Sequence, residues 1–351
     1  MKINSSFIKQ TMPFLLLIIT ILLQLIFRHH PSITESIYST NIYPIIATVL
    51  SNLSYLIPFS LSDIFYITLI GLFLFGVIRS IINRKTFFRL ILSVLQGAAL
   101  IYCLFYVLWG FNYYREPAHT KLSLTKSAAN DSTFIQMFDK VIEQTNQYYT
   151  DTNGFKKEKN DSLIEVSIKN NSAYLGLKHS MGKRRLKHIT LSNFFAKATI
   201  LGYYGPFFSE THINRHLTLW DIPVVSAHEK SHQLGVTSEA EASFYGWFIT
   251  TKSNDRFTQY AGWLYALNYF LYQSHGLKNR RKYFQKIKPE VIDDLKQQSK
   301  HWQKWRDEKI DKAAAKVNDA YLKSNNVEKG IDDYNGVVQL IIDYLQQETT
   351  K

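Results

Sequence analysis

Three apolar segments in the first third of the chain constrain its architecture more than any other feature. They cover residues 12–27, 64–82 and 90–110 and are rich in leucine, isoleucine and phenylalanine. A membrane-spanning helix needs about 20 mostly apolar residues, so all three are candidates for crossing a bilayer. The first is short, and a signal peptide is its alternative, but no small-residue cleavage site follows it. We therefore predict a membrane anchor over residues 1–110 with about three transmembrane helices.

Charged and helix-breaking residues indicate on which side of the membrane the rest of the chain lies. The apolar region Ile42–Phe59 contains Pro44, Pro58 and several polar residues, so we interpret it as an interfacial or re-entrant piece, with a fourth span as the alternative. Lysines and arginines, Lys2 among them, gather before the first span and between the second and third. The positive-inside rule then predicts a cytoplasmic N-terminus and an extracytoplasmic domain over residues 111–351.

The sequence His228-Glu229-Lys230-Ser231-His232 has the HExxH pattern of zinc-dependent hydrolases. Residues four apart lie on one face of a helix, so both histidines can point at one metal ion. Glu229 can take a proton from a zinc-bound water, whose pKa is lowered to about 7. The motif therefore predicts one Zn²⁺ per chain, with His228 and His232 as ligands and Glu229 as the general base.

Catalytic zinc needs a third protein ligand and an open position. Metzincins use HExxHxxGxxH, but Ser238 stands where their third histidine would be, and no methionine follows Met181. If the first helix ends at Gly235 and a second one folds back from Ser238, Glu241 lies in its first turn and completes the site. Ser238 and Glu241 also form a capping box, in which case Glu239 becomes the ligand. We favour Glu241, with Glu239 as the alternative third ligand.

The domain that carries this motif is predicted to be α+β and mainly α. Residues 131–150 have the apolar spacing of a helix, whereas 188–192 and 200–214 are more extended. An aromatic stripe within 259–273 is expected to be core. By analogy with zincins, which place a sheet edge beside the metal, Phe208–Asn214 is our candidate for the edge strand.

A hydrolytic site also needs a donor for the oxyanion that forms during attack on a carbonyl. His212, Tyr204 and Tyr245 are candidates, with Tyr203 and Tyr260 behind them, although in a chain with 22 tyrosines each is more commonly structural. His212 and His216 are four apart like a metal pair. Because no acidic partner accompanies them, we predict a surface or substrate-facing role.

The net charge of +13 comes with basic clusters such as Lys183–Lys187 and Lys278–Lys282. Such clusters can bind anionic lipid headgroups or an acidic envelope polymer, but more commonly they are solvated surface. No nucleic-acid module surrounds them, so no nucleic-acid partner is predicted. The one cysteine, Cys103, lies in the third span, which leaves the domain without disulfides.

Three stretches resemble a bacterial membrane-protein family known as domain of unknown function 3810. They are Trp109–Arg115, Gly205-Pro206-Phe207 with Glu210, and the HExxH motif with Gly235, Glu239, Glu241 and Phe244. That family is similar to gluzincin-type metallopeptidases, which implies a zincin-like domain with His228, His232 and Glu241 as ligands and Glu229 as base. Two departures are Lys230-Ser231, where apolar residues are usual, and Ser243, where asparagine is common.

These observations predict a multi-pass protein of the bacterial inner membrane, a zinc metallopeptidase that hydrolyses peptide or protein substrates in the cell envelope. The alternative is a catalytically silent, zinc-binding envelope sensor or scaffold, which would have no need of Glu229. An intramembrane protease is disfavoured because the motif lies roughly 120 residues beyond the last span. The sequence leaves the substrate and the oligomeric state open.

Overall fold

The structure is a computed structural model that describes residues 5–127, 130–179, 182–278, 280–325, 327, 329–330, 333 and 336–350. Lys2 and Met181, used in the predictions above, lie outside these residues. The chain forms two compact units. Unit 1 comprises Met1–Glu116, Ser180–Arg184 and Gly205–Glu210, and unit 2 comprises Pro117–His179, Arg185–Tyr204 and Thr211–Lys351. The sequence prediction divided the chain once, at residue 110, whereas each of these units combines segments from distant parts of the chain.

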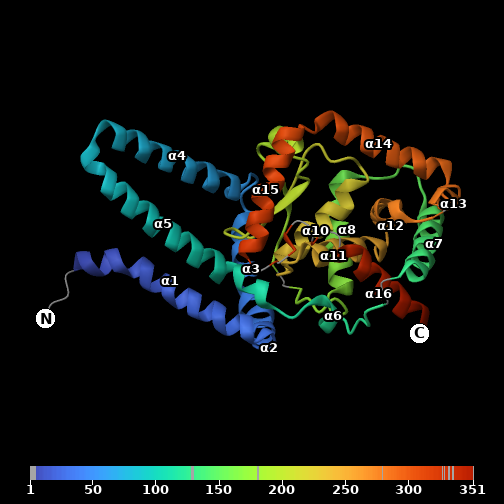
Figure 1. Cartoon of the computed structure of the whole chain (residues 1–351), viewed down its shortest axis with the longest axis horizontal. Coiled ribbons are helices and arrows are strands. Elements are labelled where there is room, and N and C mark those ends of the chain that lie inside the picture. The colour runs from blue at the N-terminus through green and yellow to red at the C-terminus, as the bar shows by residue number, and fades with distance from the viewer. Residues whose placement is uncertain are drawn as a thin grey trace. The chain divides into compact units, whose positions relative to one another are not determined.

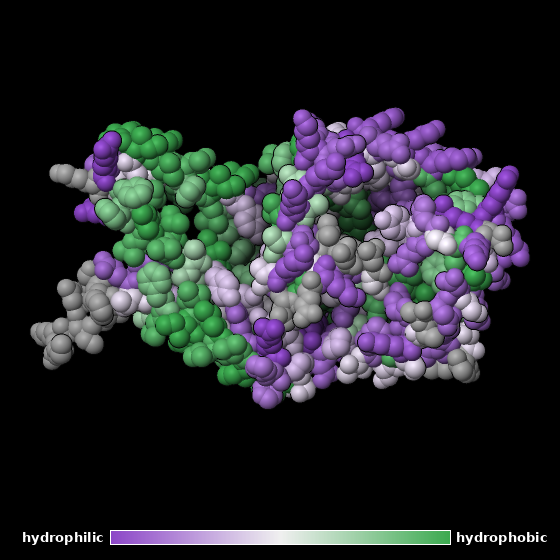
Figure 2. Space-filling model, in the orientation of Figure 1, coloured by the Kyte–Doolittle hydropathy of each residue, from purple (hydrophilic) through white to green (hydrophobic). Residues whose placement is uncertain are grey.

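Unit 1 contains three long helices, α1 (Ser5–His29), α4 (Leu61–Ile82) and α5 (Phe87–Leu108), which run alongside one another (Figure 1). Each has a stretch of at least 18 residues that is long and apolar enough to cross a membrane, with mean hydropathy 2.1. Their surfaces are predominantly hydrophobic (Figure 2). The three long apolar helices predicted from the sequence are therefore confirmed.

Shorter elements connect these helices: α2 (Pro31–Ile33), the π-helix η1 (Thr34–Ile42), α3 (Tyr43–Tyr55) and the 3₁₀ turn η2 (Arg84–Thr86). A second 3₁₀ turn, η3 (Gly110–Tyr114), follows α5. Aromatic rings pack between them, with Phe111 edge-on to Phe27 at 5.0 Å between ring centroids. Tyr38 donates a hydrogen bond of 2.8 Å to the carbonyl of Val107. α2, η1 and α3 follow one another without a break, but the long apolar part of this run is confined to α3, whose 13 residues rise about 20 Å against a hydrocarbon core of about 30 Å.

Unit 2 is mainly helical and is built around α11 (Glu239–Thr251), which is buried along most of its length. The other helices are α6 (Ala118–Lys121), α7 (Asp131–Tyr148), α8 (Lys157–Asn171), α9 (Ser192–Lys197), α10 (Asp221–Gln233), α12 (Arg256–Gln273), η4 (Ser274–Gly276), α13 (Arg280–Phe284), α14 (Pro289–Trp305), α15 (Glu308–Ser324) and α16 (Gly336–Thr350). The predicted helix at 131–150 is present as α7. Most of the predicted aromatic stripe on α12 is buried core, including Tyr260, Trp263 and Phe270.

A small sheet of three strands has the order β1 (Leu186–His188), β3 (Glu210–Ile213), β2 (Gly202–Gly205). β1 and β3 are parallel, with Leu186 opposite Thr211. The sequence prediction was wrong about the edge: the segment Phe208–Asn214 contains the central strand, and β2 is the edge beside it. It also placed β1 too late, because the chain turns after His188 and enters α9 at Ser192.

Candidate metal centre

The HExxH motif lies on α10, and the chain reverses directly after it. Gly235 has φ +86°, a left-handed conformation that glycine adopts without steric cost. The amide of Val236 donates to the carbonyl of Ser231 at 3.1 Å, the long bond of a Schellman helix end. Ser238 then caps α11 by accepting from the amide of Glu241 at 3.3 Å. The predicted break at Gly235 and the restart at Ser238 are both confirmed.

Helix α11 crosses α10 closely because Gly246 has no side chain. A Cβ atom at this position would lie 3.2 Å from the carbonyl oxygen of Val224 and 3.3 Å from the amide nitrogen of His228. Both distances are tighter than ordinary van der Waals contact, so a larger residue would push the two helices apart. This close crossing holds the start of α11 against the histidines.

His228, His232 and Glu239 bring one ligand atom each to a common point. The two Nε2 atoms are 3.1 Å apart, and Oε2 of Glu239 lies 3.2 Å from His228 Nε2 and 3.5 Å from His232 Nε2. Metal–ligand bonds of 2.0–2.1 Å in a tetrahedron place the ligand atoms about 3.3 Å apart. The three separations therefore fit one small cation with a fourth position left for another ligand.

Glu241, the favoured third ligand in the sequence analysis, faces elsewhere. Its Oε1 accepts from the amide of Ala118 at 2.7 Å, and its Oε2 is 4.0 Å from Lys121 Nζ. Two residues along a helix correspond to a rotation of about 200°, so Glu239 and Glu241 cannot face the same helix. The structure thus places the alternative, Glu239, beside the histidines. Glu241 ties α6 to α11 instead.

The outer nitrogens of the two histidines are also held. His232 Nδ1 lies 2.7 Å from the carbonyl oxygen of Val236, which can only accept, so Nδ1 carries a proton and Nε2 is the atom that faces inward toward the group. His228 Nδ1 is 3.4 Å from Ser243 Oγ. Ser243 is one of the two departures from the family pattern, and it lies where it can orient a ligand.

The electrostatics of the group suit a cation. Burial opposes charge on Glu239, but the charge of His232 and hydrogen bonds from both histidines hold the pKa of Glu239 well below its usual range. Burial lowers the pKa of His228 and keeps it neutral. Burial also opposes charge on His232, but the charge of Glu239, its hydrogen bond to His232 and the charge of Glu229 together outweigh burial and raise the pKa of His232 to about 9. A metal ion entering the site would have to displace that proton.

Glu229 is buried beside this group, with 5% of its surface exposed. Its carboxylate lies against β2, since a Cβ atom on Gly202 would fall 2.7 Å from Glu229 Oε1. Among the residues that the structure describes, Glu229 Oε2 has no hydrogen-bond partner. Burial raises the pKa of Glu229 to about 8, with His232 opposing and Glu239 adding to the effect. Burying a carboxylate oxygen without a hydrogen bond costs free energy, and a catalytic role is one explanation for such a group in a native structure.

Lys230, which belongs to the other departure from the family pattern, is fully buried at a motif position that is usually apolar. Its Nζ lies 2.7 Å from Asp161 and 2.5 Å from Glu165, both on α8. Glu165 is in turn 3.5 Å from His179. The buried cation is therefore neutralised by two carboxylates, and it fixes the motif helix to α8.

The predicted oxyanion donors are spread over the domain. Tyr245 is fully buried and donates to the carbonyl of Leu175 at 3.1 Å. His212 is buried on β3, with its ring stacked on Tyr203 at 4.3 Å, and Tyr204 is half-buried on β2. Tyr260 donates to Asp294 at 2.6 Å, while His216 bonds to Asn193 and packs against Trp305. These contacts give Tyr245 and Tyr260 structural roles.

Two tyrosines that the sequence analysis assigned to the core lie near the metal group. Tyr265 and Tyr269 on α12 have their hydroxyls 3.4 Å apart. Burial raises the pKa of both, and the charge of Glu239 contributes to each shift. Ser243 lies close enough to lower the pKa of each tyrosine, which burial nevertheless keeps raised. Their spacing of four residues on one helix face was visible in the sequence, but only the crossing of α12 over α11 connects it with the site.

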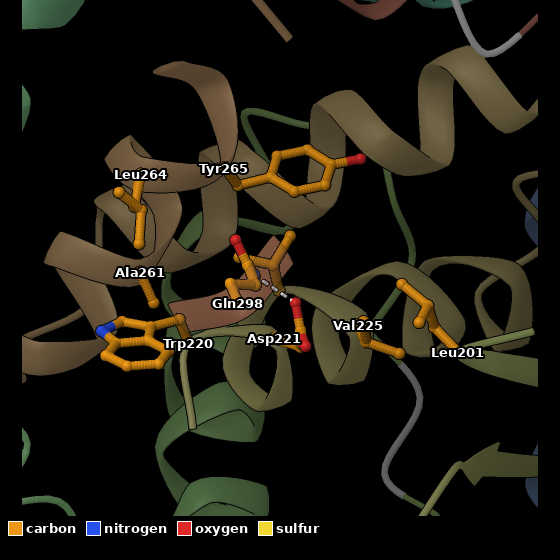
Figure 3. A pocket seen from close by; sticks show the side chains of 9 residues that line it. Leu201, Trp220, Asp221, Val225, Ala261, Leu264, Tyr265 and Gln298 are labelled. Atoms are coloured by element: carbon orange, nitrogen blue, oxygen red, sulfur yellow. Dashed lines mark hydrogen bonds between the residues drawn. The ribbon is translucent and has the colours of Figure 1, made fainter. Parts of the chain in front are cut away.

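Figure 3 shows a pocket whose lining includes Val225 and Tyr265, and Val224, one helical turn before His228 on α10, also lines it. Apolar side chains make up most of its lining, and its residues are Leu201, Trp220, Asp221, Val224, Val225, Ala261, Leu264, Tyr265 and Gln298. Asp221 accepts hydrogen bonds from Thr218, Gln298 and Trp302. Burial raises the pKa of this carboxyl. Tyr265 connects the pocket with the metal group.

A family model described as "Protein of unknown function (DUF3810)" matches residues 38–342. This confirms the family predicted from the motifs. No curated protein and no solved structure matches the chain. The description of this family names no activity and gives no evidence of a resemblance to metallopeptidases.

Proposed function

We propose that this chain, a member of the DUF3810 family, is a membrane-anchored zinc hydrolase that cleaves peptide bonds. The observation that carries the proposal is the convergence of His228, His232 and Glu239 beside the buried, partnerless carboxylate oxygen of Glu229. Structural zinc sites have four protein ligands, whereas catalytic ones have three and an open position. A group of three with a carboxylate next to it favours catalysis over a structural role.

Each residue of the site has its own role in the proposed reaction. His228, His232 and Glu239 would hold the metal, and zinc, when bound, supplies a Lewis acid that polarises a carbonyl and activates water. Glu229 takes the proton from the attacking water and passes it to the leaving amine. The close approach of Gly202 restricts the carboxylate. Burial raises the pKa of Glu229, which makes the carboxylate a stronger base in the first step and favours the protonated form in the second. Tyr265 and Tyr269 are the candidate donors to the oxyanion.

Two features support a peptide as the substrate. β2 is an edge strand next to Glu229, so an extended backbone can pair with it. The pocket between α10 and α12 is lined mainly by apolar side chains such as Val224 and Leu264 and would receive a small apolar side chain. The three apolar helices would anchor the enzyme in the inner membrane, with peptides or proteins of the cell envelope as substrates.

The test is the zinc content of the detergent-purified full chain, with peptide-library cleavage measured in parallel. We expect about one zinc per chain. Glu239→Ala should lose the metal, and Glu241→Ala, two residues away on the same helix, should retain it. Glu229→Gln should keep the metal and lose all cleavage.

The outcomes separate the alternatives. Zinc retained in Glu239→Ala and lost in Glu241→Ala would restore Glu241 as the ligand. Zinc bound with no cleavage of any peptide would favour a sensor or scaffold. Absence of zinc from the wild-type chain would overturn the proposal.

A further inference from the structure

Helix α3 in unit 1 has an exposed apolar stripe that no described residue covers. The stripe follows helical spacing and consists of Ile45, Val49, Leu53 and Leu56, each more than half exposed. The opposite face, formed by Tyr43, Ala47, Ser51 and Ser54, is buried. An exposed row of large apolar residues on one helix is unfavourable in water and favourable at a lipid surface.

A basic segment runs along the flank of this helix. The segment Gly182–Arg184 belongs to the same compact unit, and a Cβ atom on Gly182 would touch Ser51 and Thr48. The amide of Lys183 donates to Asn52 Oδ1 at 2.8 Å. The Lys183 side chain is exposed, with its Nζ 5.7 Å from the centre of the Tyr55 ring. Positive charge is thus fixed beside the apolar stripe.

The position of α3 along the chain places it at a membrane face. If α1, α4 and α5 each cross the bilayer, the end of α1, the start of α4 and the end of α5 lie on the same side. The helical run Pro31–Tyr55 connects the first two of these points, and its long apolar part is confined to the 13 residues of α3, too few to cross. It therefore lies at the interface, where headgroup phosphates are within reach of a lysine.

We propose that α3 and Lys183 form a lipid-binding surface, with the apolar stripe in the acyl–headgroup boundary and the lysine on the phosphate of an anionic phospholipid. The charge beside the stripe favours lipid over a second copy of the chain, which would have to bury the same cation. This surface is independent of the metal site and of the proposed reaction.

The test uses the full chain in a Cys103→Ser background, reconstituted in phosphatidylcholine vesicles with and without phosphatidylglycerol. A nitroxide at Leu53→Cys reports on the stripe, with Val317→Cys on α15 as the water-exposed reference and Leu72→Cys on α4 as the lipid reference. We expect the ratio of oxygen to nickel-chelate accessibility at Leu53 to be several-fold higher than at Val317. Phosphatidylglycerol should raise it further, and Lys183→Gln, but not Lys304→Gln, should remove that increase.

Each other outcome overturns the proposal. Nickel access at Leu53 equal to that at Val317 would place the stripe in water. A label inaccessible to both reagents would show protein contact, such as a second copy. A response to phosphatidylglycerol that is absent, or unchanged by Lys183→Gln, would remove the headgroup contact.

Discussion

Single side chains at the outer edge of the metal group are expected to tune its affinity. Ser243 contacts His228 Nδ1 at 3.4 Å and so helps to fix the imidazole. We expect Ser243→Ala to weaken zinc binding about tenfold, the lower end of the range for groups that orient metal ligands. Ser243→Asn, which keeps a polar group there, should retain most of the affinity. Chelator competition gives the dissociation constants, and equal values for Ser243→Ala and wild type would exclude this role.

Lys230 shows how a single residue can be buried and charged at the same time. Lys230→Met leaves Asp161 and Glu165 without their cation, because the methionine cannot replace the two ion pairs. Breaking a buried ion pair from one side costs about 3 kcal/mol. We expect a comparable loss in the free energy of unfolding, measured by denaturant titration in detergent. Lys178→Met, at an exposed position, is the control, and equal stability of the two variants would contradict the argument.

For single residues, the sequence correctly predicted that His228 and His232 come together, but it favoured Glu241 beside them, where the structure has the alternative, Glu239. The motif fixes His228, Glu229 and His232 on a single helix, which requires only local geometry. The choice between Glu239 and Glu241 depends on what each faces, namely α10 or the amide of Ala118, over 100 residues earlier in the chain. The partners of Lys230 are distant in the same way.

Among the elements, the reversal between α10 and α11 depends on one glycine. A side chain at Gly235 would occupy the left-handed region, which costs roughly 1–2 kcal/mol for an L-residue. We expect Gly235→Ala to lower the free energy of unfolding by that amount and to weaken zinc binding, because the turn places Glu239. Gly154→Ala, in open space with an ordinary φ, is the matched control. Unchanged stability and unchanged zinc affinity would show that the turn tolerates a side chain.

The start of helix α4 depends on a residue far from it in sequence. Glu210 is buried and accepts from the amides of Leu61 and Ser62 at 3.2 and 2.8 Å, and from Ser62 Oγ at 2.8 Å. Glu210→Ala would leave these first-turn donors unpaired, at a cost of about 2 kcal/mol. Glu210→Gln should recover part of the loss, since its carbonyl oxygen still accepts. Thermal unfolding in detergent measures both, and equal loss in the two variants would indicate a packing effect.

Local sequence signals predicted the elements better than their pairing. The helix end at Gly235, the cap at Ser238 and the long apolar helices follow from neighbouring residues, and all are present. The order of the sheet could not be predicted, because β3 pairs with β1 more than 20 residues before it. The link from Glu210 to α4 joins residues 148 positions apart.

If the three apolar helices each cross the membrane, they determine which parts of the chain share a side of it. An odd number of spans puts the connection between α4 and α5 on the side of the N-terminus, and unit 2 on the other side with α3. The positive charges near that connection, such as Arg84 and Arg89, favour the cytoplasm for it. Unit 2, which carries the metal group, would then lie outside the cytoplasm.

Cysteine labelling tests this arrangement in the Cys103→Ser background. A membrane-impermeant maleimide should label Val317→Cys on α15 in spheroplasts before lysis, and Asn83→Cys, at the end of α4, only after lysis. The reversed pattern would place unit 2 in the cytoplasm and exclude envelope substrates, while leaving the metal group and its chemistry unaffected. Labelling of both positions before lysis would require an even number of crossings between them, and α5 would then not span the bilayer. The metal group is therefore independent of the membrane topology, because the group depends on distances within unit 2 and the topology depends on the three apolar helices.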